Sequence, residues 1–267
     1  MDPVITDTSK LFFKVNPSLK LICFAFLFIL YLSVQNLNTM IWTTVAFSIV
    51  TLWANGLPRK WSVGFFLMTF IVSFFSASAM ILYGKGSHVL FQWFLIRTTE
   101  ESLARGIQLG LRTFVFGLLG VLFASTTPPV PFFYSLMQQL KVPVRYAYGC
   151  LAAFRMLPMM AEELGHIRQA MKVRGMSRQK GLRAFYERFL HYALGILVQS
   201  IRRAQRTAVA MEAKRFSMKE KRTFYYQIGW SRKDLIFLSV MTVTVVSGFL
   251  LSRWIPLTPY TNVIDGY

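Results

Sequence analysis

Long runs of apolar residues dominate both ends of this chain. Four of them occupy residues 19–34, 39–54, 61–83 and 235–251, and a fifth, 107–125, is apolar except for Arg112 near its start. A helix needs about 20 predominantly apolar residues to cross a bilayer, and roughly 17 are tolerated. We therefore expect an all-α membrane protein with about five transmembrane helices. The apolar octet 89–96 is too short to cross, so we expect it to lie at the interface or to pack against the bundle.

The pattern changes between the runs 107–125 and 235–251, which are the fourth and fifth in chain order. Pro128, Pro129 and Pro131 break the fourth helix, because proline cannot continue a helix. A short apolar helix over 132–140 follows, and then apolar residues at steps of three and four predict a long helix up to Gly175. We expect Pro158 to kink or restart this helix, and Gly175 to end it in the left-handed conformation.

A second long helical pattern runs from about residue 179 to residue 216, with Phe185, Phe189, Ile196 and Ser200 along one side. At about 1.5 Å per residue this helix is longer than a bilayer core is thick. We therefore expect two long amphipathic helices along or below the membrane. The predicted regions are an N-terminal membrane region (1–127), a cytoplasmic helical region (128–233) and a last span with its tail (234–267).

Charge predicts the orientation of these regions. The net charge is +19, and residues 128–234 carry twenty Lys and Arg against six Asp and Glu, which is +14 of that total. Lysines precede the first span and Arg59 and Lys60 follow the second, whereas the turn 35–38 is uncharged. Because Lys and Arg accumulate in cytoplasmic loops, we expect a multi-pass protein of the cell membrane with its N-terminus in the cytoplasm and its C-terminus outside.

Composition argues against several classes of function. The chain is 54% hydrophobic and 15% charged, far from a typical soluble domain. It has no Gly-x-x-x-x-Gly-Lys-Ser/Thr motif, so we expect no ATP hydrolysis by this chain and no catalytic residues. Isolated Cys23 and Cys150 and three scattered histidines predict no metal site. Basic charge alone is weak support for nucleic-acid binding.

Two further alternatives remain open. A self-sufficient membrane carrier normally needs polar substrate-binding groups near the bilayer midplane, and the spans offer few besides Arg112. That arginine either snorkels from the outer end of its helix to the interface or makes a buried polar contact in the bundle. A basic, membrane-anchored protein that binds anionic lipid also fits the charge.

A short motif occurs twice in the basic region. Residues 170–176 read AMKVRGM and residues 210–217 read AMEAKRFS, so that Ala170 precedes Arg174, and Ala210 precedes Lys214, by one helical turn. A cation at a helix C-terminus complements the helix dipole, by typically 0.3–1 kcal/mol, and attraction to anionic lipid has a similar size. Neither effect requires the alanine. A small residue beside a cation favours a docking surface for a partner.

Motifs along nearly the whole chain resemble the transmembrane (T) component of energy-coupling factor transporters, a family that includes the cobalt-type permease subunit. They are NPSLKL (16–21), in which Asn16 replaces the usual Asp, TTEESLARGIQLGLR (98–112), STTPP (125–129), LKVPVRYAYGCLAAFRMLPMMAEELGHIRQAMKVRG (140–175) and AMEAKRF (210–216). The 140–175 block contains Arg155, Pro158 and the acidic pair Glu162 and Glu163.

The resemblance implies a membrane scaffold without a cofactor of its own. In this family, long coupling helices end in two Ala-Arg-Gly-type motifs that insert into a pair of ATP-binding-cassette ATPases, which bind ATP and Mg²⁺. The scaffold also holds a small membrane protein, the S component, which binds a vitamin or metal ion. The implied docking residues are Ala170, Arg174 and Gly175, and Ala210, Lys214 and Arg215; Arg155, Pro158, Glu162 and Glu163 are implied to have structural or coupling roles.

The second motif departs from the family pattern, because Lys214 and Arg215 stand where Arg-Gly is usual. Lysine keeps the charge but lacks the planar fork of guanidinium donors. Arg215 either supplies that guanidinium or points elsewhere. Two unequal docking motifs also suit a heterodimeric or fused pair of ATPases, and the resemblance assigns the choice of cargo to the S component.

Overall fold

The computed structural model describes residues 11–84, 89–93, 96–175, 181–215, 224 and 227–258. The chain divides into two compact units, Met1–Ser135 with Ile228–Tyr267, and Leu136–Gln227. Helices make up most of the described residues in both units, as expected for an all-α membrane protein.

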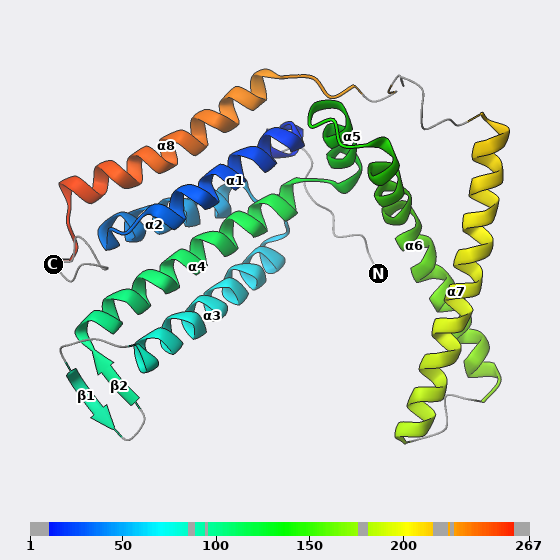
Figure 1. Ribbon diagram of the computed structural model, residues 1–267, viewed down its shortest axis with the longest axis horizontal. Helices are drawn as coiled ribbons and strands as arrows, with labels where there is room; N and C mark the ends of the chain where they lie inside the picture. The colour runs from blue at the N-terminus through cyan, green and yellow to red at the C-terminus, as the bar shows by residue number, and fades with distance from the viewer. Residues whose placement is uncertain are drawn as a thin grey trace. The chain divides into compact units, whose positions relative to one another are not determined.

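Each of the five predicted spans forms a helix of the first unit. These are α1 (Pro17–Ser33), α2 (Leu37–Ala54), α3 (Arg59–Tyr83), α4 (Glu100–Thr126) and α8 (Arg232–Trp254), which lie alongside one another in Figure 1. The last four are long and apolar enough to cross a membrane, and α1 is an apolar helix of 17 residues. That length is near the lower limit for a span. A short 3-10 helix, η1 (Leu11–Lys14), precedes α1.

The core of this unit lies between α1, α2, α4 and α8. Its fully buried large side chains include Tyr31, Phe47, Leu118, Leu122, Phe237 and Met241. Helix α3 lies outside this core and packs along α4 (Figure 1). Its outer face carries exposed apolar side chains such as Phe70, Phe74 and Phe75. A contiguous exposed apolar face is expected where lipid or a membrane partner covers a helix.

Glycines on α4 let α3 approach closely. A Cβ added to Gly117 would overlap Cγ2 of Thr69 on α3, whereas a Cβ on Gly120 would meet nothing within 4 Å. Overpacking a tight contact typically costs about 1–3 kcal/mol. The α3–α4 contact therefore depends on Gly117 but not on Gly120.

We predict that Gly117→Val lowers the free energy of unfolding by about 1–3 kcal/mol more than Gly120→Val. Both changes replace glycine with the same β-branched residue on the same helix, so their difference reports packing against α3. Unfolding of the purified protein in a denaturing detergent titration measures it. Equal free energies for the two variants would contradict the packing seen at Gly117.

A small β-hairpin interrupts the helical architecture. Strands β1 (Val89–Trp93) and β2 (Ile96–Thr99) pair antiparallel between α3 and α4 (Figure 1). The described residues of the apolar octet therefore belong to β1 and to the first position of β2, and Val89, Phe91 and Trp93 suit a strand. Helix α4 begins directly after β2, because Thr99 and Ser102 form a capping box. This cap starts α4 well before the apolar run that begins at residue 107.

The predicted break after the fourth span is confirmed. Helix α4 ends at Thr126, and α5 (Pro129–Gln139) begins with a proline. Proline is favourable in the first helical turn, where its missing N–H has no partner in any case. The proline-rich segment thus ends one helix and starts the next.

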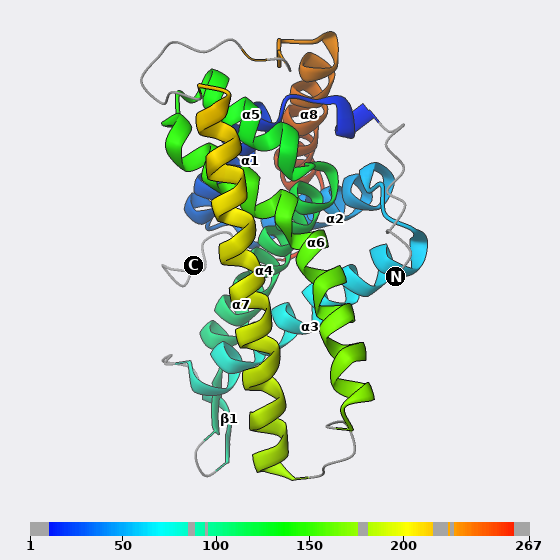
Figure 2. The same cartoon turned by 90° about the vertical axis from the view of Figure 1, so that its right-hand side faces the viewer.

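Most of the described residues of the second unit lie in two long helices, α6 (Val144–Val173) and α7 (Leu182–Ala213). Figures 1 and 2 show α7 returning past α6 in the opposite direction. The helices are in contact at Gly195 of α7, where an added Cβ would lie 3.0 Å from Cδ1 of Ile167. Their 30 and 32 residues correspond to lengths of about 45–48 Å. The predicted end of the second helix at residue 216 lies outside the described residues.

Of the two predicted effects of Pro158, a kink or a restart of the helix, the restart is wrong. Helix α6 runs continuously from Val144 to Val173 with Pro158 inside it. Proline removes one hydrogen bond of the helix. Because Pro158 is exposed, water can satisfy the freed carbonyl, and the helix continues on both sides.

Candidate functional site

The first predicted docking motif forms the C-terminal end of α6. The helix ends at Val173, and the backbone N–H of Arg174 donates to the carbonyl oxygen of Ala170 over 3.1 Å. Gly175 then turns the chain away with a φ of +77°, in the left-handed region that glycine favours. Ala170, Arg174 and Gly175 are all exposed. The motif is therefore an accessible helix end, as its spacing predicts.

The second motif forms the end of α7 with the same backbone geometry. The N–H of Lys214 donates to the carbonyl oxygen of Ala210 over 3.2 Å, and Arg215 has a φ of +52°. Lys214 thus corresponds to Arg174, and Arg215 occupies the position of Gly175. All three residues of this end are exposed. The structure brings neither motif onto the other; each ends its own helix.

The left-handed position of Arg215 is strained. A left-handed backbone costs a residue with a Cβ roughly 1–2 kcal/mol, and glycine avoids this cost. Gly175 meets this requirement at the end of α6, whereas Arg215 places a long cationic side chain at the equivalent point of α7. Arg215 therefore adopts, at a cost in backbone free energy, a conformation that glycine would adopt without that cost.

We predict that Arg215→Gly stabilises the last turn of α7 by about 1 kcal/mol, while Gly175→Ala destabilises the last turn of α6 by a similar amount. Hydrogen exchange of the backbone amides of Lys214 and Arg174 measures these opposite effects. If Arg215→Gly leaves amide protection at Lys214 unchanged or lowers it, the left-handed conformation at residue 215 is contradicted.

The four residues of α6 that were assigned structural or coupling roles differ in their exposure. Arg155, Pro158 and Glu162 are exposed, whereas Glu163 is half-buried and faces α7. There it lines a small cavity with Arg203, whose Nη1 is buried without a hydrogen-bond partner among the described residues. Glu163 therefore belongs to the contact between α6 and α7, and this placement favours a structural role for it.

A buried polar cluster in the first unit was not predicted as a cluster. The charged Lys20 side chain, 1% exposed, donates from Nζ to the carbonyl oxygen of Thr126 over 2.9 Å, at the end of α4. Asp234, also 1% exposed, interacts electrostatically with Lys20 and accepts the backbone N–H of Asn16 over 2.8 Å. The Asn16 side chain in turn accepts a hydrogen bond from Ser135 of α5.

This cluster joins four segments of the chain. It links the entry to α1, the end of α4, the helix α5 and the first turn of α8 through Asn16, Lys20, Thr126, Ser135 and Asp234. A cation at the C-terminus of α4 and a carboxylate in the first turn of α8 both complement the helix dipoles. Lys20 was expected to be one of the loop charges at the entry to the first span, whereas in the structure it is buried and bonded to the end of α4.

Arg112 is half-buried and makes a polar contact between two helices of the bundle, which resembles the second of its two alternatives. Its Nη2 donates to the carbonyl oxygen of Val34 over 2.8 Å, and Gln108, one turn earlier on α4, donates to the same oxygen. Val34 is the residue that ends α1. These donors satisfy a carbonyl that a helix end leaves without an intrahelical partner. Both α1 and α4 therefore have a basic residue at their C-terminal end.

The chain is similar in sequence to one protein family and to several named proteins. The chain matches the CbiQ family, described as cobalt transport protein, over residues 8–226. Three proteins named energy-coupling factor transporter transmembrane protein EcfT are similar to it over most of their length. That of Limosilactobacillus fermentum is 28% identical over 89% of this chain and 91% of its own. That of Lactococcus lactis is 27% identical over 87% and 91%, and that of Bacillus subtilis 26% over 91% and 94%.

The matched region covers most of the membrane helices as well as both long helices, and it includes the two helix ends at Arg174 and Lys214. It begins before α1 and ends beyond α7. The chain therefore belongs to the CbiQ family of cobalt transport proteins.

Proposed function

We propose that this chain is the membrane-embedded energy-coupling subunit of an ATP-driven transporter that imports a vitamin or a metal ion. The observation that carries the proposal is the pair of matching helix ends: α6 and α7 both stop at an exposed cation, one turn after an alanine, and continue in the left-handed conformation. The similarity to proteins named EcfT supports the same function.

The two helix ends are the proposed contacts with two ABC-type ATPase subunits or domains. Ala170 and Ala210 are small enough for a partner surface to approach the last helical turn closely, and Arg174 and Lys214 project charge from the same place. Among the described residues, neither cation forms an ion pair within this chain. ATP and Mg²⁺ are bound and ATP is hydrolysed by these partners, and this chain transmits their movement.

The proposed contact with the S component is an apolar stripe on α7. Tyr186, Leu190, Leu194, Leu197 and Ile201 follow one another at steps of four, four, three and four residues and are 41–64% exposed. This spacing puts them on one face of the helix. An exposed stripe of this kind is expected to be covered by another apolar surface. Helix α7 therefore presents one surface to the S component and its end to an ATPase.

We expect Leu194→Glu to remove the small S component from complexes purified through a tag on this chain, while both ATPases remain. A carboxylate in an apolar contact loses its hydration without gaining a partner, and residue 194 is far along α7 from Lys214. Arg202→Gln, on the same helix but off the stripe, changes the net charge by the same amount and should retain all components. Loss of the ATPases together with the S component would argue against two separate surfaces.

The proposed location is the cell membrane, with the N-terminus and the unit of α6 and α7 on the cytoplasmic side and the C-terminus outside. The positive-inside rule supports this orientation, and so does the need of the partner ATPases for cytoplasmic ATP. Several membrane helices in the described residues agree with a multi-pass protein.

A further inference from the structure

Two covalent connections join the second unit to the first. The outgoing connection is α5, because the first unit ends at Ser135 and the second begins at Leu136, both within this helix. The returning connection leads into α8, whose N-cap is Ser231. Each connection reaches the first unit at a buried polar side chain, Ser135 in α5 and Asp234 in the first turn of α8.

Asn16 binds both connections. Its backbone N–H donates to Oδ1 of Asp234 over 2.8 Å, and its side-chain Oδ1 accepts the hydroxyl of Ser135 over 2.9 Å. Ser18, in the first turn of α1, adds a contact with α5, because its backbone N–H donates to Oγ of Ser135 over 3.0 Å. Asn16 is itself the N-cap of α1 and is buried. One residue therefore holds together the entry of α1, the outgoing helix and the returning helix.

Rearrangement of this contact is costly. Its hydrogen bonds join buried groups, and a buried donor or acceptor that loses its partner still carries the penalty for leaving water. Lys20 extends the contact to α4, since its Nζ donates to the carbonyl oxygen of Thr126 over 2.9 Å. We therefore expect the entry of α1, the end of α4 and the first turns of α5 and α8 to move as one body.

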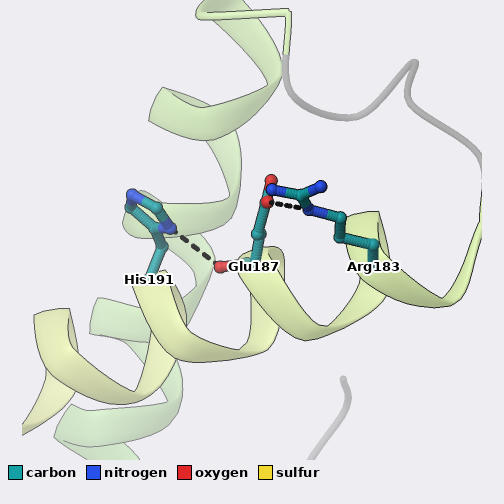
Figure 3. Close-up of polar contacts among 3 residues, drawn as sticks. All are labelled: Arg183, Glu187 and His191. Carbon is teal, nitrogen blue, oxygen red and sulfur yellow. Dashed lines mark hydrogen bonds and ion pairs between the residues drawn. The ribbon is translucent and has the colours of Figure 1, made fainter.

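Polar contacts on α7 are of a different kind. Nε of Arg183 donates to Oε1 of Glu187 over 3.2 Å, and Nδ1 of His191 donates to the carbonyl oxygen of Glu187 over 2.8 Å (Figure 3). These residues follow one another at steps of four, a spacing that supports a single helix. Such contacts stiffen α7 itself, whereas those at Asn16 join separate elements.

The chain can bend just after α5. Residues 140–143 separate α5 from α6, and Lys141 among them has a φ of +52°. Lys141 and Pro143 are exposed. Hinges are typically a few residues in loops or at the ends of elements that absorb changes in φ and ψ. This exposed turn fits that description, and the buried contact at Ser135 does not.

We propose that Asn16 is a positioning residue for energy coupling. With Ser135 and Asp234 it forms a fixed anchor, so that both connections of the second unit act on the membrane helices at one point, and bending takes place at residues 140–143. The inference rests on the proposed function, in which the ATPases move α6 and α7. A fixed anchor directs this movement into α1, α4 and α8 together, because the hydrogen bonds of the buried polar cluster join these helices.

Hydrogen exchange of the purified chain tests whether Asn16 joins the two connections. Ser135→Ala removes a hydroxyl from α5 and leaves Asp234 in place. One hydrogen bond changes an equilibrium by roughly three- to tenfold. We therefore expect the backbone amide of Asn16 to exchange at least about threefold faster in this variant. Because that amide donates to Asp234 of α8, faster exchange would show that the loss in α5 reaches the other connection.

Ser239→Ala is the matched control for Ser135→Ala. Ser239 is exposed on α8, and its hydroxyl donates to the carbonyl oxygen of Ile236 in the same helix. Exchange at Asn16 should therefore be unchanged in this variant. If Ser135→Ala accelerates exchange at Ser18 but not at Asn16, the two connections are independent and the proposal fails.

A cross-link between α1 and α5 tests whether the anchor stays fixed. The hydroxyl groups of Ser18 and Ser135 are hydrogen-bonded to each other, so an oxidant should join these positions in S18C/S135C, with Cys23 and Cys150 replaced by alanine. We expect the same yield of disulfide in the ATPase complex without nucleotide, with a non-hydrolysable ATP analogue, and with ADP and vanadate. Oxidation should leave ATP hydrolysis unchanged.

Two results of the cross-linking would overturn the proposal. A disulfide that forms in one nucleotide state only, or that stops ATP hydrolysis until it is reduced, would show that α5 leaves α1 during the cycle. Absence of the disulfide in every state would contradict the contact between Ser18 and Ser135. Failure of the unchanged chain to bind ATPases would refute the docking proposal instead, and the exchange experiment, which needs no partner, would still decide whether Asn16 joins the two connections.

Discussion

Replacing Arg174 with glutamate is expected to leave the protein in the membrane and to abolish both copurification of the ATPases and substrate uptake. Arg174 is exposed at the end of α6 and forms no ion pair among the described residues. Its replacement therefore removes no ion pair seen within the chain. A negative charge at a helix C-terminus costs about 0.3–1 kcal/mol. Reversal of a charge inside a protein interface typically costs more, about 2–5 kcal/mol, which lowers affinity by roughly 30-fold or more.

Two other variants at exposed arginines control for charge and for geometry. Arg206→Glu makes the same charge reversal on α7 away from either helix end, and it should retain the ATPases and uptake. Arg174→Lys keeps the charge but loses the planar guanidinium, so we expect partial loss. Copurification of the ATPases in unchanged amounts with Arg174→Glu would show that the end of α6 is not a docking contact.

Replacing Lys20 with methionine is expected to lower the free energy of unfolding by about 1–3 kcal/mol, because Asp234 loses a nearby buried cation with which it interacts electrostatically. The methionine fills similar space, but the carbonyl oxygen of Thr126 also loses its donor. The double variant Lys20→Met/Asp234→Asn should recover part of this loss, since it removes both charges. Unfolding of the purified protein in a denaturing detergent titration measures all three.

Lys14→Met is the matched control for Lys20→Met. Lys14 lies in η1 and is exposed, so its replacement removes the same charge from solvent and should change stability by less than about 0.5 kcal/mol. Equal effects of the two lysine variants would contradict the buried position of Lys20. A double variant no more stable than Lys20→Met alone would contradict its coupling to Asp234.

The positions of the membrane helices could be predicted from the sequence because apolar runs report burial in lipid directly. The ends of the helices were harder to predict from the sequence. Helix α4 begins at Glu100 rather than near residue 107, since the Thr99–Ser102 capping box sets its start and its first turns are polar. The continuity of α6 through Pro158 depends on solvent exposure at that residue, which periodicity does not reveal.

The candidate site was predictable where it is local in sequence. The spacing of Ala170, Arg174 and Gly175 predicts a helix that ends in a left-handed glycine, and the structure has this helix end. The buried cluster is different, because the contact between Asn16 and Asp234 joins residues 218 positions apart. Nothing local to Lys20 distinguishes a buried lysine from a charge of the N-terminal loop.

The surfaces of α7 illustrate the same limit. The sequence pattern places Phe185, Phe189, Ile196 and Ser200 along one side. In the structure all four lie on the side of α7 that faces α6, since Ile196 and Ser200 line a cavity with Glu163 and Phe185 and Phe189 line one with Leu164. The exposed stripe that includes Leu194 lies on another face and became evident only from the exposure of its side chains. A helix with apolar residues on several faces does not reveal which face its neighbour covers.

Uptake into proteoliposomes tests the proposed function most directly. The chain is reconstituted alone, with its two ATPases, and with the ATPases and the S component, and labelled substrate is counted with and without ATP. Uptake is expected only when all components and ATP are present, and it should be lost when the chain carries Arg174→Glu. Substrate uptake by this chain alone, or uptake that needs neither ATP nor the ATPases, would identify a self-sufficient carrier and contradict the proposed function.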